Sequence, residues 1–380
     1  MPRLTACFSL RCSRMLLLAL LIAVPGMLRA QAQPAPTRVA IVGLVHGHIG
    51  GFLHAIPLHH DVQLVGIAEP DTALAASYAK RFNLPASLLF TDTETMIKAT
   101  HPQALLVYTS IAGHRPAIEL AGKYGVSVMV EKPLTISVGD ALAIRKIARE
   151  DHIHVLVNYE TTWYTSNRAA YDASEQGRIG EIRRIVVHDG HQGPALIHVQ
   201  PEFGKWLTDP VQNGAGALYD FGCYGVDLTT WLLHGQTPIS VTAVATHDQP
   251  ENYPKVEDDS TILLVYPHTE AVIQGSWDWP FARKDMEVYG ATGYAITVGP
   301  SQIKMRLPKE MAEEDLTIAP PLSPDESNSL SYLTAVLNGK IVDKGDLTAL
   351  DTNVIVMQIL DAARDSIRTG KSIPLTPLPE

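Results

Sequence analysis

The fold of this chain is constrained most by a repeated pattern in its first half. Short apolar runs end at a glycine turn or a polar residue, and each is followed by a longer amphipathic stretch. The runs are typical of buried parallel strands and the stretches of helices. Strands are expected at residues 38–42, 62–68, 104–108, 126–130 and 152–157, and helices at residues 71–81, 114–124 and 137–150. Parallel strands need crossover connections, which are almost always right-handed. The pattern therefore predicts a doubly wound α/β domain over residues 37–157.

The pattern changes after residue 158, where several apolar runs alternate with polar residues. Strands are expected at residues 183–188, 240–246, 260–265, 271–277, 286–290 and 295–298. Such alternation is typical of an antiparallel sheet with one covered face. A last amphipathic helix is expected at residues 351–369, with Gly370 as its stop. We therefore expect a second, α+β domain over residues 158–380, with a mostly antiparallel open sheet.

The first 32 residues are predicted to be a signal peptide outside the fold. Its parts are the basic residues Arg3, Arg11 and Arg14, an apolar core at residues 15–24, and a small-x-small cleavage signal at residues 30–32. The apolar core is short, which disfavours a permanent membrane anchor. The protein is therefore expected to be exported, periplasmic or secreted, with no membrane association after cleavage.

The net charge argues against a nucleic-acid partner, and the cysteine content excludes an internal disulfide. Four of the 30 basic residues lie in the signal segment, which leaves 26 against 40 acidic residues, a formal charge of −14. A nucleic-acid partner would need clustered positive charge, and none is visible. Cys223 is the only cysteine after residue 32, so the mature chain forms no internal disulfide.

A glycine-containing loop follows the first predicted strand and precedes a helix. In the dinucleotide-binding pattern G-x-G-x-x-G, Val45 and His48 stand where glycines are expected. Gly43 still permits the tight turn, and Gly47 permits close approach of a pyrophosphate. His46 and His48 are expected to line the cofactor. The loop alone is weak evidence, because glycine turns occur in any doubly wound sheet.

Glu69 strengthens the dinucleotide interpretation. It ends the second strand about 26 residues after Gly43, close to the spacing at which an acidic residue bonds the adenosine ribose. An acid there repels a 2′-phosphate, so NAD is favoured and NADP is less expected. Thr109, His114 and Tyr159 stand at strand ends or a helix start and are expected to face the same crevice.

The tripeptide Glu131-Lys132-Pro133 stands where a buried strand ends. Ligands of open parallel sheets bind beyond the carboxyl ends of the strands, so Lys132 is placed to point its ammonium into the cleft. Glu131 and Lys132 are both expected to contact the cofactor. Proline makes the turn stiff. The alternative is a charged loop cap with no role in binding.

A second cluster follows a glycine-rich stretch in the second domain. A helix from about residue 217 would place Asp220, Tyr224 and Asp227 on one face. The alternative is a polar helix stripe with structural partners. For the H-x-H pairs at 46/48 and 152/154, no cysteine or carboxylate cluster completes a metal site, so no metal is expected.

These motifs together resemble the Gfo/Idh/MocA oxidoreductases. The resemblance rests on the glycine turn, Glu69, E-K-P at 131–133 and G-A-G-A-L-x-D-x-G-x-Y at 214–224, and it extends to residues 179–184 and 288–298. It implies a Rossmann domain and a second domain whose open sheet often mediates oligomerisation, so a homodimer or tetramer is expected. It also implies that Lys132, Asp220 and Tyr224 are catalytic, with tyrosine at the last position as in the glucose–fructose oxidoreductase and dihydrodiol dehydrogenase branches.

The residue types suit oxidation of a secondary alcohol, in which hydride leaves carbon as a proton leaves oxygen. Tyr224 is expected to carry the proton, with its pKa lowered by Lys132, and Asp220 to orient the sugar or the lysine. The export signal conflicts with the cofactor, because nicotinamide cofactors are scarce outside the cytoplasm. Three hypotheses remain: an NAD-dependent sugar or polyol oxidoreductase that retains its cofactor, a redox-neutral NAD-dependent glycosidase, or a non-catalytic sugar-binding protein.

Overall fold

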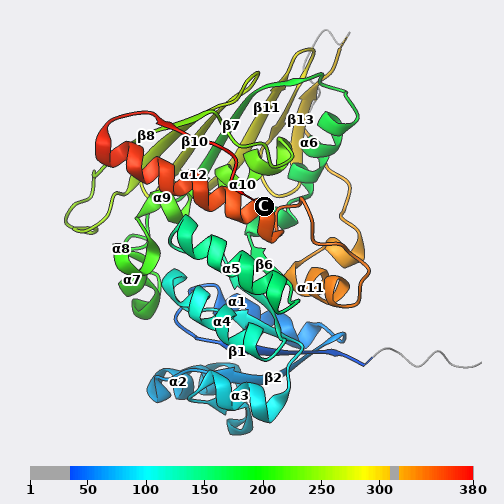
Figure 1. The fold of residues 1–380 in the computed structure, drawn as a ribbon, viewed down its shortest axis with the longest axis vertical. Coiled ribbons are helices and arrows are strands. Elements are labelled where there is room, and N and C mark those ends of the chain that lie inside the picture. The colour runs from blue at the N-terminus through cyan, green and yellow to red at the C-terminus, as the bar shows by residue number, and fades with distance from the viewer. Residues whose placement is uncertain (1–34, 309–315, 380) are drawn as a thin grey trace, which may run out of the picture. The chain divides into compact units, whose positions relative to one another are not determined.

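A computed structural model describes residues 35–308 and 316–379, which form two sheets with their covering helices (Figure 1). The predicted signal peptide, residues 1–32, lies outside the described residues. Among the helices of the described ranges, none combines the length and the apolar character that a membrane span requires.

The first sheet has six strands, and all its neighbouring strands are parallel. In chain order they are β1 (Thr37–Val42), β2 (Val62–Ala68), β3 (Leu89–Phe90), β4 (Ala104–Val107), β5 (Ser127–Glu131) and β6 (Val155–Asn158). Their spatial order is β3-β2-β1-β4-β5-β6. The order reverses between β1 and β4, where the crevice of a doubly wound sheet binds its ligand. The predicted Rossmann architecture is confirmed.

Helices cover both faces of this sheet. They are α1 (Ile49–Ala55), α2 (Thr72–Phe82), α3 (Thr93–Thr100), α4 (His114–Lys123) and α5 (Val138–Glu150). The predicted cap of α2 is confirmed, because the Asp71 carboxylate accepts hydrogen bonds from the backbone N–H groups of Ala73 and Leu74. Helix α3 was not expected from the sequence.

The predicted strand at residues 152–157 is wrong at its start. His152 has a left-handed backbone with φ of 54°, so the chain is still turning there and β6 begins only at Val155. His152 and His154 therefore do not share a strand face. His154 instead places Nδ1 3.0 Å from a carboxylate oxygen of Asp343.

The second sheet has nine strands in the order β14-β13-β12-β11-β7-β10-β9-β8-β15. In chain order they are β7 (Ile182–Gly190), β8 (Ser240–Thr246), β9 (Asp259–Val265), β10 (Glu270–Ser276), β11 (Arg283–Gly290), β12 (Tyr294–Thr297), β13 (Gln302–Arg306), β14 (Thr317–Ile318) and β15 (Ile373–Pro374). Every neighbouring pair is antiparallel except β7 and β10, which run parallel. The mostly antiparallel second sheet is therefore confirmed.

Helices lie against one face of this sheet. The second part of the chain contains α6 (Thr165–Glu175), α7 (Pro201–Leu207), α8 (Pro210–Asn213), α9 (Ala217–Asp220), α10 (Gly222–Leu232), α11 (Ser329–Leu337) and α12 (Leu350–Thr369). In Figure 1, α10 and α12 lie on the side of the sheet that faces α5. Helix α12 ends as predicted at Gly370, which has a left-handed φ of 66°.

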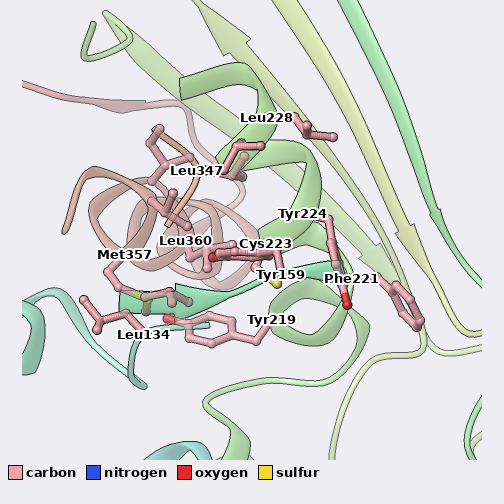
Figure 2. Close-up of a cluster of buried hydrophobic side chains, with 14 of the residues drawn as sticks. Leu134, Tyr159, Tyr219, Phe221, Cys223, Tyr224, Leu228, Leu347, Met357 and Leu360 are labelled. Carbon is pink, nitrogen blue, oxygen red and sulfur yellow. The ribbon is translucent and has the colours of Figure 1, made fainter. Parts of the chain in front are cut away.

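The second sheet packs closely against α10. Ile185 and Val187 of β7 and Ile273 of β10 are fully buried. A Cβ on Gly225 of α10 would lie 2.4 Å from the Ile273 side chain, so only glycine allows this approach. The same core continues to Tyr159, Tyr219 and Met357 (Figure 2). Burial of each large apolar side chain contributes about 2 kcal/mol.

The boundary between the two parts is less simple than the sequence suggests. Residues 158–380 were expected to form the second domain. Leu330 and Leu333 of α11, however, belong to the core that also contains Val39 and Ile41 of β1. The chain therefore returns to the first sheet near its C-terminal end.

Candidate active site

Lys132 lies directly after β5, at the carboxyl end of the first sheet, and is joined to Pro133 by a cis peptide bond. It is buried, and its ammonium group forms an ion pair with Oδ1 of Asp220 and donates a 2.8 Å hydrogen bond to the Asp220 carbonyl oxygen. The other carboxylate oxygen of Asp220 accepts a 2.9 Å bond from Nε1 of Trp277. The fold thus brings together two predicted catalytic residues that are 88 positions apart in the sequence.

Both members of this pair are held in their charged forms. Burial alone would raise the pKa of Asp220, but the ammonium of Lys132 and the hydrogen bond from Trp277 bring it down to about 2. Burial alone would likewise lower the pKa of Lys132, and Asp220 more than reverses this. A buried ion pair keeps its charge only when such partners offset the loss of hydration.

Two ammonium groups lie close to the Tyr224 ring. Nζ of Lys132 is 5.1 Å from the ring centroid, and Nζ of Lys284 in β11 is 4.5 Å from it. Figure 2 shows Tyr224 beside Phe221, at one side of the buried cluster. The third predicted catalytic residue therefore adjoins the other two.

The predicted effect on the Tyr224 hydroxyl is wrong. Burial raises the pKa of Tyr224 well above its usual value, and nearby carboxylates act in the same direction. Lys132 does not reverse this, because its ammonium lies over the ring face and its charge is neutralised by Asp220. The tyrosine is thus a neutral phenol at physiological pH.

The predicted continuous helix from residue 217 is also wrong. The chain forms α9 and α10, which are interrupted at Phe221. Asp220 ends the first helix, and its carbonyl oxygen accepts from Lys132 at 2.8 Å and from the Cys223 thiol at 3.4 Å. Asp227 is fully buried further along α10, and neither of its carboxylate oxygens has a hydrogen-bond partner among the described residues. Asp227 is therefore not part of this site.

Glu131 connects β5 to the glycine loop. One of its carboxylate oxygens lies 3.0 Å from Nδ1 of His48, and the other accepts a 2.9 Å bond from the Asn158 side chain. Burial would raise the pKa of Glu131, but His48 and Asn158 bring it down to about 2. A buried negative charge therefore stands beside the loop and fixes the His48 ring.

His46 completes a group of potential metal ligands with His48 and Glu131. One ligand atom from each lies within 4.8 Å of the others. The sequence offered no carboxylate for these histidines, and the fold brings Glu131 to them. His46 is buried, and the loss of hydration holds its pKa well below the usual value. Its Nδ1 accepts from the His48 backbone N–H, and its ring packs on Phe203. Absence of a metal remains a prediction.

Two glycines shape the loop in different ways. Gly43 has a left-handed φ of 82°, and a Cβ there would lie 2.8 Å from the Thr109 side chain. This confirms the tight turn and places Thr109 against it. A Cβ on Gly47 would instead lie 2.7 Å from the Phe203 ring of α7. The close approach that Gly47 permits is thus to Phe203 in this structure, and its contact with a pyrophosphate remains a prediction.

Glu69 lies at the end of β2 as expected, and its carboxylate is hydrogen-bonded to the glycine loop after β1. Its two carboxylate oxygens accept hydrogen bonds of 2.8 Å and 2.9 Å from the backbone N–H groups of Leu44 and Asp71. Each carboxylate oxygen can accept more than one bond, so this geometry leaves acceptor capacity for a ribose hydroxyl. The first sheet thus fits a dinucleotide, since Gly43, Glu69 and the end of β5 all stand at the carboxyl ends of its parallel strands.

Tyr159 does not face the crevice, contrary to expectation, whereas His114 is buried and its contact with a cofactor stays a prediction. His114 is fully buried with Nδ1 3.2 Å from the Leu134 carbonyl oxygen, and burial lowers its pKa to about 4. His114 Nδ1 thus contacts the loop after Pro133, and its Nε2 has no hydrogen-bond partner among the described residues. The Tyr159 hydroxyl donates to the Asn353 side chain of α12 at 3.0 Å, inside the core.

A cavity of about 610 Å³ adjoins this cluster, and its lining includes residues that the sequence analysis missed. They are Glu160, Tyr164, His191 and Lys284. Lys284 forms an ion pair with Glu160 and faces the Tyr224 ring. No sequence motif marks these four residues; only the pairing of β11 with β7 reveals that Lys284 points towards the helices.

Comparison with known proteins agrees with this architecture. A model described as an oxidoreductase family with an NAD-binding Rossmann fold matches residues 37–159, and a model of the GFO/IDH/MocA C-terminal domain matches residues 167–296. The trans-1,2-dihydrobenzene-1,2-diol dehydrogenase of Homo sapiens is 27% identical over 232 residues, which span 60% of this chain and 64% of that protein. The rabbit (Oryctolagus cuniculus) enzyme of that name is 25% identical over 306 residues, covering 77% of this chain and 83% of that protein.

Solved structures share the fold. The aldose-aldose oxidoreductase of Caulobacter crescentus superposes with a TM-score of 0.75 at 20% identity, covering 90% of this chain and 100% of that one. An inositol dehydrogenase homologue of Azotobacter vinelandii, complexed with NAD+, gives 0.75 at 19% identity, covering 90% and 98%. With both family models matched over more than half of its length, the chain belongs to the Gfo/Idh/MocA family and carries that family's NAD-binding Rossmann domain.

Proposed function

We propose that the protein is an NAD-dependent oxidoreductase that acts on the CH–OH group of a sugar, polyol or related cyclic alcohol. The observation that carries the proposal is the buried Lys132–Asp220 ion pair beside Tyr224, at the end of β5 and next to a cavity of about 610 Å³. Relatives named as diol, inositol and aldose oxidoreductases support the choice of an alcohol substrate.

NAD is the expected cofactor, and bound nicotinamide supplies the hydride acceptor. Gly43 and Glu69 would hold its adenosine and phosphate part, with His46, His48, Thr109 and Glu131 along the loop. The Glu69 carboxylate disfavours a 2′-phosphate, which is the reason to expect NAD rather than NADP. The Glu131 charge keeps the His48 ring fixed at the loop.

Lys132 is proposed to stabilise the substrate oxygen. An ammonium has three donors, and Asp220 accepts two of them through its carboxylate and carbonyl oxygens. The third is available to an oxygen on which negative charge develops during hydride transfer. Asp220, itself held by Trp277, orients the ammonium.

Tyr224 is proposed to exchange the proton with the substrate oxygen. Because burial raises its pKa, the phenol form that donates in ketone reduction predominates, whereas alcohol oxidation needs the scarce phenolate. His191 is a weaker candidate for the base. Its Nδ1 accepts from the Gly193 backbone N–H at 2.9 Å, so the neutral ring carries its proton on Nε2 and offers the cavity a donor.

Two other functions remain open. A redox-neutral glycosidase would use the same groups to oxidise and re-reduce one sugar. A non-catalytic sugar-binding protein is favoured only by the substitutions at Val45 and His48 in the glycine loop. We further propose that the protein is exported, retains its cofactor, and forms a homodimer or tetramer through the open face of the second sheet. Light scattering that finds a monomer at micromolar concentration would refute the last point.

The first experiment is to purify the protein from its natural compartment, denature it, and assay the supernatant for NAD and NADP. Stoichiometric NAD supports a retained cofactor and directs a screen of sugars in pairs, one oxidised while the other is reduced. Release of an aglycone without net NADH would select the glycosidase. Protein that is empty and also fails to bind added NAD would leave the sugar-binding function.

A further inference from the structure

The cavity beside Tyr224 is built by elements of the second part of the chain. Glu160 and Tyr164 come from the segment that follows β6, and Lys284 comes from β11. Alternate residues of a strand face the same side, and Met286 and Val288 are buried, so Lys284 shares the covered face of the sheet. Lys284 therefore connects the cavity to Tyr224, because it lines the cavity and its Nζ lies 4.5 Å from the centroid of that buried ring.

Lys284 and Glu160 form an ion pair inside this cavity. The second oxygen of the Glu160 carboxylate accepts a 2.7 Å hydrogen bond from the Tyr164 hydroxyl. The two side chains are 19% and 53% exposed, against 5% and 7% for Lys132 and Asp220. The Lys284–Glu160 pair is therefore more open to a ligand than the Lys132–Asp220 pair.

The charges of the cavity are balanced. Arg283 donates to both carboxylate oxygens of Asp285, at 2.7 Å and 3.0 Å. Asp189 lies opposite Lys284 in the β7–β11 register and is buried, and burial raises its pKa and favours the uncharged acid. Both cations in the described lining, Arg283 and Lys284, are thus matched by a carboxylate, and the cavity offers no unpaired positive charge to an anion.

We propose that the Glu160–Lys284 pair recognises hydroxyl groups next to the reacting carbon and restricts the site to uncharged polyhydroxylated rings, so that sugar acids are rejected. This inference rests on the proposed function and names its substrate class. A hydroxyl donates to the carboxylate and accepts from the ammonium in one contact. A substrate carboxylate only accepts, and beside Glu160 it meets a like charge. Phe281, 65% exposed at the cavity, offers apolar surface to a sugar ring.

The test compares matched neutral and acidic sugars on the whole protein with NAD added. D-glucose against D-glucuronate and D-galactose against D-galacturonate are titrated by calorimetry, and NADH formation is followed separately. The neutral member should bind at least about tenfold more tightly in both pairs. Glu160→Gln should reduce this preference for the neutral sugar about tenfold, because the glutamine amide can donate a hydrogen bond to a substrate carboxylate. Lys284→Met should weaken binding of the neutral sugar about tenfold.

Glu326→Gln is the matched control. Glu326 is also a partly buried acid in an ion pair, with Arg168 at 3.0 Å, but it lines a different cavity, so the ratio should not change. Equal or tighter binding of the acids, an unchanged ratio in a folded Glu160→Gln protein, or binding of none of the four sugars would overturn the inference. A neutral preference without NADH formation would sink the proposed function alone, whereas NADH formed preferentially from the acids would sink the inference alone.

Discussion

Two lysine–carboxylate pairs lie close to the Tyr224 ring, and they differ in what surrounds them. The Lys132–Asp220 pair is buried, and Trp277 holds its free carboxylate oxygen. The Lys284–Glu160 pair is partly open to the cavity, with Tyr164 as its only further hydrogen-bond partner among the described residues. An ammonium and a carboxylate thus form a fixed, buried ion pair at Lys132–Asp220 and a pair that faces the cavity at Lys284–Glu160. The difference comes from how deeply each pair is buried.

Of the variants that compare the two pairs, Lys132→Met should lose the most activity. Lys132→Met should lower kcat for alcohol oxidation about a thousandfold, because it removes the donor to the developing negative charge. NAD binding, measured by calorimetry, should weaken far less than kcat falls. Lys284→Met should leave kcat at saturating sugar within about tenfold and act mainly on KM. Equal losses of kcat in the two variants would remove the distinction between the pairs.

Replacement of Tyr224 should show whether its hydroxyl carries the proton during hydride transfer. The raised pKa keeps Tyr224 protonated at neutral pH, so the rate of oxidation should climb as pH rises towards 10, while the rate of ketone reduction stays flat. Tyr224→Phe should lower both rates about a hundredfold and abolish the climb. A plateau near pH 7 in the wild type would contradict the raised pKa.

The third prediction concerns the buried Lys132–Asp220 pair, which should make the free energy of unfolding depend on pH in the acidic range. The pKa of Asp220 is about 2 in the folded chain and near 3.8 when unfolded, so its contribution is present above pH 4 and lost as pH falls towards 2. The shift corresponds to about 2 kcal/mol of unfolding free energy. Asp220→Asn should flatten this part of the curve of unfolding temperature against pH. The exposed residue Asp365 offers the control, since Asp365→Asn should leave the slope as it is.

The smallest effect is expected at Trp277. Trp277→Phe removes the 2.9 Å donor to Asp220 and keeps most of the packing, so kcat should fall by about five- to tenfold. The control is Trp163→Phe, which removes an indole bond to Asn158 outside the pair. A larger loss from the control than from Trp277→Phe would mean that Trp277 does not position Asp220.

The first sheet could be predicted from the sequence because its strands are continuous apolar runs. The residue that follows such a run lies at the sheet edge, so Glu69 and Lys132 were placed correctly without any knowledge of tertiary contacts. Their partners were not derivable in that way. Contact between Lys132 and Asp220 was expected only from the family resemblance, since nothing local joins positions so far apart.

The errors have a common physical origin in side-chain direction and charge balance. Tyr159 follows β6 at the crevice, but its hydroxyl bonds to Asn353 inside the core. Lys284 sits in a strand whose register no motif specifies, so its direction was unknown. The pKa of Tyr224 was wrong because the sequence indicated one nearby cation and could not indicate that Asp220 neutralises it.

The return of α11 to the first sheet sets the order in which the chain can fold. Leu330 and Leu333 complete the core around β1, and α12 packs against α5, so the first sheet lacks part of its interior until residues beyond 329 have been synthesised. Domains that are continuous in sequence usually fold as they emerge from the ribosome. This chain must instead remain incomplete until near its last residues, and such a delay suits a protein whose predicted leader directs it across a membrane before it folds.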